Sequence, residues 1–283
     1  MEARVNSLES QITGLLRLVP SVTQQSICTG SLTNIVLTCN RPATEFIWTT
    51  AIISSPIGGS ITGISNQNSG SKYIISQRLV NSGSSPGIVK YTATPRLGQI
   101  IGQPVSIIVT VNPIPIITNK SISICSESTI NIIPVNNTTD LVPNNTTYTW
   151  TTLDNNNILG EGPSTIPQVS ISQTLTNLTN TPQNIIYTVT PKYLNCSGNS
   201  FTINVTINPK PVISNKVISI TSGTPFTLNP TNNVSGDLVP NNTLYTYIVS
   251  NNPNITGAFN QTTPQSLITQ ALNNTSNIPQ III

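Results

Sequence analysis

The stretch Thr202-Ile-Asn-Val-Thr-Ile207 alternates polar and apolar side chains along its whole length. Successive side chains of a β-strand point to opposite faces, so this pattern is typical of a half-buried strand with Ile and Val facing inward. The same alternation places apolar residues at every second position of Val105-Ser-Ile-Ile-Val-Thr-Val111. Both stretches are therefore predicted to be strands of one kind.

This recurrence belongs to an internal repeat with an offset of 96 to 97 residues. Tyr91-Thr-Ala-Thr-Pro95 returns as Tyr187-Thr-Val-Thr-Pro191, and Asp140-Leu-Val-Pro-Asn-Asn145 returns unchanged as Asp237-Leu-Val-Pro-Asn-Asn242. We therefore predict an N-terminal segment and three copies of one unit, the third incomplete, with the boundaries 1–22, 23–115, 116–212 and 213–283.

Each copy contains about seven short apolar-alternating runs in about 96 residues, separated by Asn-Asn, Ser-Gly and Asn-Pro turn signals. This spacing favours an immunoglobulin-like (Ig-like) sandwich of two antiparallel sheets. Another small all-β barrel is the alternative. The predicted fold class is all-β: tandem sandwich repeats preceded by a short N-terminal α-helix.

Several motifs recur at matching places, among them Phe46-Ile-Trp-Thr49, Tyr148-Thr-Trp-Thr151 and Ile75-Ser-Gln-Arg-Leu79, and the second copy adds Asn195-Cys-Ser-Gly198. With these motifs the sequence, from about residue 27 to its end, resembles the PKD-like, Ig-like repeats of large bacterial cell-surface and adhesin proteins. The resemblance implies β-sandwiches that serve as spacers or adhesive modules. The high Asn and Ile content also suits an AT-rich genome, such as that of a large DNA virus with surface fibres.

The second copy has two cysteines, Cys125 near its first strand and Cys196 before its last. We predict a disulfide between them, which closes a loop of about 70 residues and stabilises the unit by about 4 kcal/mol on the loop-entropy model. Cys28 and Cys39 of the first copy are then expected to pair locally. For both pairs the alternative is two free buried thiols.

The residues before Pro20 have a helical period. Apolar side chains recur at steps of three and four, as in the a and d positions of a coiled coil; they are Val5, Leu8, Ile12, Leu15 and Val19. Pro20 is expected to end this helix. Two roles remain open: an oligomerising helix at one end of the molecule, or an amphipathic helix that packs on the first copy.

The composition excludes most catalytic chemistry. The chain has no His, and its 8 carboxylates show no paired spacing, so we expect no enzyme and no cofactor. A net charge of +3 provides no basic stripe for nucleic acid, and no run of about 18 apolar residues predicts a membrane span. Asp140 and Asp237, each followed by Asn residues, are weak candidates for Ca²⁺; a turn-forming role is the alternative.

The third copy ends one residue before the position where Tyr187 would recur. Truncation of a longer array is the favoured interpretation, and a strand donated by a neighbouring molecule is the alternative. The Asn-Pro-x-Pro seams between copies predict a stiff rod. We therefore expect a non-enzymatic structural stalk, fibre or filament that self-associates on a cell or virion surface. The second hypothesis is an adhesive module whose loops recognise a glycan or a host surface protein.

Overall fold

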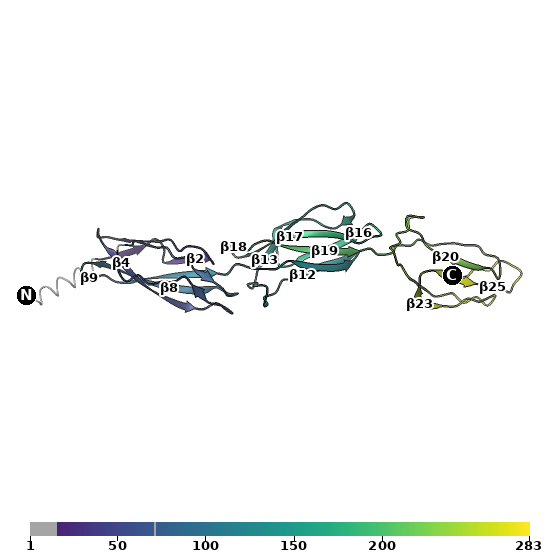
Figure 1. The fold of residues 1–283 in the computed structure, drawn as a ribbon, viewed down its shortest axis with the longest axis horizontal. Helices are drawn as coiled ribbons and strands as arrows, with labels where there is room; N and C mark the ends of the chain where they lie inside the picture. Colours follow the sequence, from purple (N-terminus) through teal and green to yellow (C-terminus); the bar gives the residue numbers. More distant parts are fainter. Residues whose placement is uncertain (1–15, 71) are drawn as a thin grey trace, which may run out of the picture.

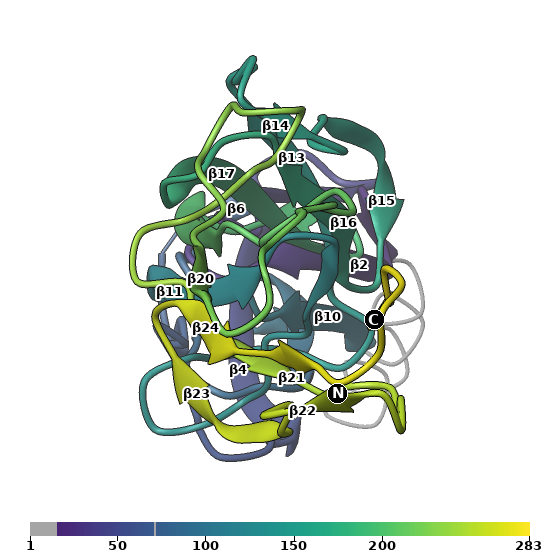
Figure 2. The same ribbon diagram turned by 90° about the vertical axis from the view of Figure 1, so that its right-hand side faces the viewer.

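The computed structural model describes residues 16–70 and 72–283. Three β-units lie end to end along the long axis of the molecule (Figure 1). Seen along that axis the units overlap, so the molecule is a narrow rod (Figure 2). We call residues 16–112 unit 1, residues 120–208 unit 2 and residues 216–283 unit 3; the linkers are residues 113–119 and 209–215.

Unit 2 shows the complete arrangement, a sandwich of two sheets. The larger sheet has the order β11 (Lys120–Cys125), β19 (Phe201–Asn208), β17 (Gln183–Tyr193), β13 (Thr147–Thr152) and β15 (Ser164–Gln168), with β18 (Cys196–Ser197) paired to β17. The smaller sheet consists of β12 (Ser128–Ile132), β16 (Ile171–Asn177) and β14 (Ile158–Leu159). The first strand, β11, runs parallel to the last, β19, whereas the other neighbours are antiparallel.

Unit 1 repeats this plan. Its larger sheet has the order β2 (Gln24–Cys28), β10 (Val105–Asn112), β8 (Gly87–Leu97) and β4 (Glu45–Ser54), with β9 (Ile100–Ile101) paired to β8. The smaller sheet consists of β1 (Leu18–Pro20), β3 (Ile35–Cys39) and β6 (Ile74–Ile75), and β5 (Ile61–Thr62) pairs with β7 (Val80–Asn81). Again the first strand of the larger sheet runs parallel to the last.

Each of the first two units encloses its own hydrophobic core, and the two cores share no residue. The alternation read in the sequence decides which side chains are inside: Ile203, Val205 and Ile207 are fully buried. Because every second side chain of a strand faces the opposite sheet, the intervening Thr and Asn face outward. The prediction of all-β sandwiches in tandem is therefore confirmed.

One hydrogen bond of the same kind joins the two layers of each complete unit. The hydroxyl of Tyr91 donates to Oε1 of Gln77 at 3.0 Å in unit 1, and the hydroxyl of Tyr187 donates to Oε1 of Gln173 at 2.8 Å in unit 2. Both tyrosines are fully buried. The Ile-Ser-Gln-x-Leu motif therefore supplies the amide partner for the Tyr-Thr-x-Thr-Pro motif.

A glycine recurs at the same position in all three units because two backbone segments pack closely there. Gly63, Gly160 and Gly257 have φ angles of 86°, 91° and 84°. A Cβ atom at any of them would lie 2.3 Å or less from a backbone carbonyl oxygen of the facing segment. No other residue fits this position without moving the backbone.

Unit 3 consists of three two-stranded sheets. They pair β20 (Pro225–Leu228) with β24 (Ile268–Ala271), β21 (Tyr245–Tyr247) with β23 (Gln261–Gln265), and β22 (Ile255–Thr256) with β25 (Asn273–Asn274). The buried residues of unit 3 are few: Pro230, Asp237, Gln270 and Leu272. This unit therefore lacks an apolar interior of the kind found in units 1 and 2.

The helix predicted for residues 1–22 falls mostly on residues 1–15, and Val5, Leu8, Ile12 and Leu15 lie outside the described residues. For the described part the prediction is wrong, because Leu18–Pro20 forms β1 and Val19 lies opposite Thr38 of β3. Leu18 enters the core of unit 1, so tertiary pairing overrides the local helical period here. The described residues contain no helix.

Candidate functional site at the junctions between units

A disulfide crosses the first junction. Cys28, the last residue of β2 in unit 1, bonds to Cys196 in β18 of unit 2, with a Cα–Cα distance of 5.5 Å. The two residues are 168 positions apart in the sequence. The bond therefore joins two separately cored units.

The predicted Cys125–Cys196 pair is wrong because the two residues lie at opposite ends of unit 2. Cys125 ends β11 opposite Asn208, where the chain leaves toward unit 3. Cys196 lies in the hairpin of β17 and β18, at the end that faces unit 1 (Figure 1). The thiol of Cys125 is free and exposed.

The predicted Cys28–Cys39 pair is also wrong. Cys28 ends β2 and Cys39 ends β3, and the two strands belong to different sheets. The turn after Cys28 leads into the start of β3, and Cys39 lies at the far end of that strand. At about 3.3 Å per residue, the length of β3 therefore separates Cys39 from this turn. Cys39 is a free, half-buried thiol whose Sγ donates to Oδ1 of Asn40 at 3.3 Å.

Backbone contacts fix the linker to unit 2 at the same junction. Ile116 and Leu141 exchange two backbone hydrogen bonds of 2.9 and 2.8 Å. A Cβ atom built on Gly198 would lie 2.2 Å from the carbonyl oxygen of Pro115. The β18 hairpin therefore packs directly on the linker, and glycine permits the approach.

The second junction repeats the paired backbone hydrogen bonds. Val212 and Leu238 exchange backbone hydrogen bonds of 2.9 and 2.7 Å, as Ile116 and Leu141 do. Lys210 and Glu127 also form an ion pair across the base of the linker. Both of these side chains are more than half exposed, so the pair adds little stability.

Asp140 anchors the start of unit 2 to its linker. Its Oδ1 accepts hydrogen bonds of 2.8 Å from both the backbone N–H and the hydroxyl of Thr118. Lys120 Nζ lies 2.5 Å from Oδ2. Burial raises the pKa of Asp140, but the hydrogen bonds from Lys120 and Thr118 outweigh burial and hold the pKa below its ordinary value.

Asp237 has the same role in unit 3. Its Oδ1 accepts bonds of 2.8 and 2.7 Å from the N–H and the hydroxyl of Ser214, and Lys216 Nζ lies 2.6 Å from Oδ2. Hydrogen bonds from Lys216 and then Ser214 lower the pKa of Asp237 to about 2. In both units one carboxylate oxygen therefore contacts a lysine ammonium and the other accepts hydrogen bonds from the linker.

Both carboxylate oxygens of the Ca²⁺ candidates Asp140 and Asp237 already contact a lysine or the linker. Few lone pairs of these carboxylates are therefore left to coordinate a metal ion. The neighbouring amide oxygen of Asn137 accepts the backbone N–H groups of Thr139 and Asp140, both at 2.8 Å, and thereby closes the turn. Within the described ranges no three His, Cys, Asp or Glu side chains come together as a metal-binding group. The contacts are those of the turn-forming alternative.

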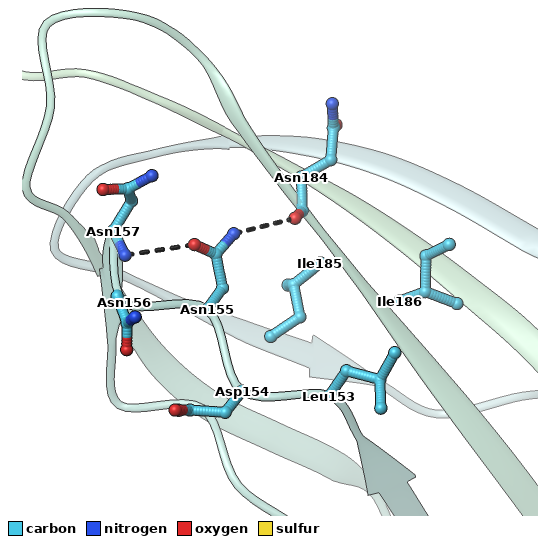
Figure 3. A pocket seen from close by; sticks show the side chains of 8 residues that line it. All are labelled: Leu153, Asp154, Asn155, Asn156, Asn157, Asn184, Ile185 and Ile186. Atoms are coloured by element: carbon cyan, nitrogen blue, oxygen red, sulfur yellow. Dashed lines mark hydrogen bonds between the residues drawn. The ribbon is translucent and has the colours of Figure 1, made fainter.

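A surface depression of about 480 Å³ lies beside the start of β17 (Figure 3). Residues 153–157 and 184–186 line it. Asn155 Nδ2 donates to the carbonyl oxygen of Asn184 at 3.4 Å, and Asn155 Oδ1 accepts the N–H of Asn157 at 3.0 Å. The depression is thus built by an asparagine turn.

The same turn occurs in unit 3. Asn252 Nδ2 donates to the carbonyl oxygen of Ile281 at 3.0 Å, and Asn252 Oδ1 accepts the N–H of Asn254 at 3.0 Å. Repetition of these contacts indicates that the asparagines shape the loop. The junctions, rather than this depression, are the most specialised feature of the molecule.

The sequence contained a signal for the inter-unit disulfide that the predicted pairings did not use. Cys28 and Cys125 occupy the same repeat position, so a bond from Cys196 to either would satisfy the pattern. Because the first strand of the larger sheet runs parallel to the last, its cysteine lies at the far end of the unit. Only the neighbouring unit can then provide the hairpin partner.

The profile of a family described as "PKD-like domain" matches residues 25–115, 122–211 and 219–283. Among solved structures, titin domains I67-I69 share 11% identity over 93% of this chain and 90% of that chain, with a TM-score of 0.36. The Escherichia coli adhesin FdeC shares 12% identity over 93% and 89%, with a TM-score of 0.38. The D00-D0 domain of intimin shares 13% identity over 68% and 99%, with a TM-score of 0.31.

No curated protein matches the chain. Within the described residues no helix is long and apolar enough to cross a membrane.

Proposed function

Because the chain belongs to the PKD-like domain family, we propose that it is a non-enzymatic structural protein whose units form a stiff surface stalk or fibre. The observation that supports this function best is the Cys28–Cys196 disulfide, since it restrains the angle between two units instead of closing a loop within one. Proline-rich linkers and paired backbone hydrogen bonds act in the same direction.

The location proposed is outside the cell, on a cell surface or on a virion. Disulfides persist in oxidising compartments and are rare in the cytosol. A chain in which only 7% of the residues are charged also gives little attraction to nucleic acid or to anionic membranes. We propose self-association of the stalk as well, through Val5, Leu8, Ile12 and Leu15, which lie outside the described residues.

Electron microscopy of single molecules tests the stalk function. We expect the oxidised chain to show a narrow distribution of the angle between units 1 and 2. Cys28→Ser should broaden that distribution, whereas the matched variant Cys39→Ser, which leaves the disulfide intact, should not. Equal angular spread in the two variants would remove the main support for a stiff stalk.

An adhesive role is the second candidate, and an exposed sheet edge favours it. β15 is the last strand of the larger sheet of unit 2, and Ile166 within it is 70% exposed. Such an edge offers backbone groups and an apolar side chain to a host surface protein. Glycan stacking has less support, because Trp48 and Trp150 are 4% and 5% exposed.

A glycan array and a filament assay separate the two roles. Filaments without saturable glycan binding support the structural function, and saturable binding that disappears on loop substitution supports the adhesive one. For self-association, we expect Leu8→Glu combined with Ile12→Glu to reduce the oligomer mass in light scattering.

A further inference from the structure

Within the described residues, the larger sheet of unit 3 has no counterpart of the two central strands of unit 2. In unit 2, β19 and β17 lie between β11 and β13. In unit 3, β21 and β23 pair as β13 and β15 do, but residues 216–221, the counterpart of β11, pair with no strand in the described part of the chain. The sheet is therefore interrupted between residues 216–221 and β21.

This interruption exposes apolar side chains that are covered in unit 2. Ile122 and Ile124 of β11 pack against the core of unit 2. Their counterparts Ile218 and Ile220 are 48% and 39% exposed. Residues 216–221 thus keep the apolar pattern of a paired strand without the partner strand.

Gln270 of β24 occupies the position that Gln173 of β16 has in unit 2. It is 6% exposed, and its Nε2 donates to the carbonyl oxygen of Phe259 at 2.5 Å. Gln173 makes the same bond to Gly162, and its Oε1 also accepts the hydroxyl of Tyr187 on β17. No described residue donates to Gln270 Oε1, so this acceptor lacks the tyrosine donor that its counterparts have in units 1 and 2.

Asn274 differs from its counterpart Asn177 in the same way, at the position next to β19. Asn177 Nδ2 donates to the carbonyl oxygens of Thr181 and Ile207, and Ile207 lies on β19. Asn274 Nδ2 donates to Ile278, which corresponds to the first of these bonds. Within the described residues the second bond has no counterpart.

The free thiol of Cys125 indicates a third feature of a hairpin that would complete the larger sheet of unit 3. Cys28 and Cys125 each end the first strand of a larger sheet, opposite Asn112 and Asn208 respectively. Cys28 bonds to Cys196 in the β17–β18 hairpin of the following unit, whereas Cys125 is an exposed thiol. Because the two junctions share their linker contacts, a hairpin of this kind in unit 3 would reach Cys125.

We propose that unit 3 binds a β-hairpin with the chemistry of residues 187–208, and that a cysteine of the hairpin forms a disulfide with Cys125. The occupant has apolar residues at alternate positions, a tyrosine hydroxyl for Gln270 and a backbone carbonyl for Asn274. Its backbone pairs with residues 216–221 on one side and with β21 on the other. The proposal does not depend on the stalk function, since it concerns completion of one unit.

The hairpin also carries a glycine two positions after its cysteine. In unit 2, Gly198 follows Cys196 in this way and lies against the carbonyl oxygen of Pro115. Pro211 is the matching residue of the second linker. A Cys-x-Gly turn is therefore part of the recognised chemistry.

Disulfide formation removes two electrons and two protons from the two thiols, and a small-molecule disulfide such as oxidised glutathione accepts them. The Cys125 thiolate attacks this disulfide, forms a mixed disulfide and releases one glutathione thiolate. The hairpin thiolate then attacks the Cys125 sulfur and releases the second glutathione. The final bond joins Cys125 to the hairpin cysteine.

A synthetic peptide of residues 187–208, added to the full chain in a glutathione redox buffer, tests the proposal. We expect a one-to-one covalent adduct in mass spectrometry, linked at Cys125. Amide hydrogen exchange should slow in β21, in β24 and in residues 216–221. Cys125→Ser should abolish the covalent adduct but keep reversible binding with the same exchange protection.

Two control peptides make the test specific. A peptide of scrambled order should give neither protection nor preferential reaction at Cys125. The peptide variant Tyr187→Phe should bind Cys125→Ser protein about tenfold more weakly, because Gln270 Oε1 then stays unpaired. The proposal is overturned by equal reaction of the scrambled peptide, by an adduct without exchange protection, or by Cys125-linked dimers that form in preference to the adduct.

A variant chain tests the same site without an added peptide. The carbonyl oxygens of Ile281 and Asn184 accept equivalent bonds from Asn252 and Asn155, so Ile283 corresponds to Ile186. A chain in which a copy of residues 187–208 directly follows Ile283 should protect Cys125 from thiol reagents and gain one cooperative unfolding transition. A freely reactive Cys125 and an unchanged unfolding profile in this variant would contradict the proposal.

Discussion

The hydroxyl of Tyr187 donates to Oε1 of Gln173 at 2.8 Å and thereby joins β17 of the larger sheet to β16 of the smaller one. Burial, and secondarily the charge of Glu161, raise the pKa of Tyr187, so the hydroxyl stays protonated and remains a donor. The bond orients the two layers of the sandwich relative to each other. The Tyr–Gln hydrogen bond recurs in units 1 and 2 and thus helps to hold each sandwich together.

Tyr187→Phe should destabilise unit 2 by about 1–2 kcal/mol, because it leaves an amide oxygen without its donor inside the sandwich. Urea unfolding followed by Trp150 fluorescence, in a Trp48→Phe background, reports on unit 2. Tyr193→Phe on the same strand is the matched control, since the Tyr193 hydroxyl bonds to no other described residue. An equal loss of stability in the two variants would show that the hydrogen bond contributes nothing.

The Asp237 carboxyl should titrate near pH 2. Its pKa lies below the ordinary value of 3.8 because Lys216 and Ser214 favour the ionised form. A depressed folded-state pKa gives stability that is complete above about pH 4 and is lost as the pH falls through about 2. Carboxyl NMR shifts across this range measure the midpoint.

Lys216→Met supplies the control for this titration. With the ammonium removed, the bonds from Ser214 remain, so the midpoint should rise but stay below 3.8. A midpoint of 3.8 in the unsubstituted chain, or no change in the variant, would contradict the assigned contacts.

Much of the sandwich could be predicted from local pattern. Ile203, Val205 and Ile207 face inward because the strand period is two, and that period is visible in any window of the sequence. The offset between Tyr91 and Tyr187 gave the tandem order in the same way. These properties depend on neighbours in sequence or on identical copies.

The cysteine pairing and the N-terminal strand could not be read in this way. Pairing of Cys28 with Cys196 depends on which end of a unit each strand reaches, and this follows from the parallel β2–β10 pair. Val19 has a helical spacing, yet it lies in β1 because Leu18 gains burial in the core beside β3. Both outcomes are tertiary effects that override a local signal.

A non-reducing tryptic digest should recover one linked pair of peptides. Cleavage does not occur before Pro42 or Pro211, so Cys28 is carried by peptide 18–72 and Cys196 by peptide 193–216. We expect these two peptides joined, and peptide 121–192 linear with Cys125 as a thiol that alkylating reagents modify in the native protein. A link between peptides 121–192 and 193–216 would instead restore the pairing within unit 2.

Gly198→Ala should weaken the first junction more than it weakens unit 2. The added Cβ would lie 2.2 Å from the carbonyl oxygen of Pro115, a backbone atom that cannot rotate away, so the hairpin and the linker must separate. Cys196 lies two residues earlier and moves with the hairpin. We expect the equilibrium constant for the Cys28–Cys196 disulfide in a glutathione buffer to fall about tenfold, equivalent to about 1.4 kcal/mol.

Gly162→Ala is the matched control, because its Cβ would meet only Gln173 Nε2, at the ordinary contact distance of 3.9 Å. Thiol alkylation and mass spectrometry measure the disulfide fraction, and Trp150 fluorescence measures the unfolding of unit 2. Loss of the disulfide with an almost unchanged Trp150 transition locates the effect at the junction. If Gly198→Ala left the disulfide fraction equal to that of Gly162→Ala, close packing of the hairpin on the linker would not be what holds the two cysteines together.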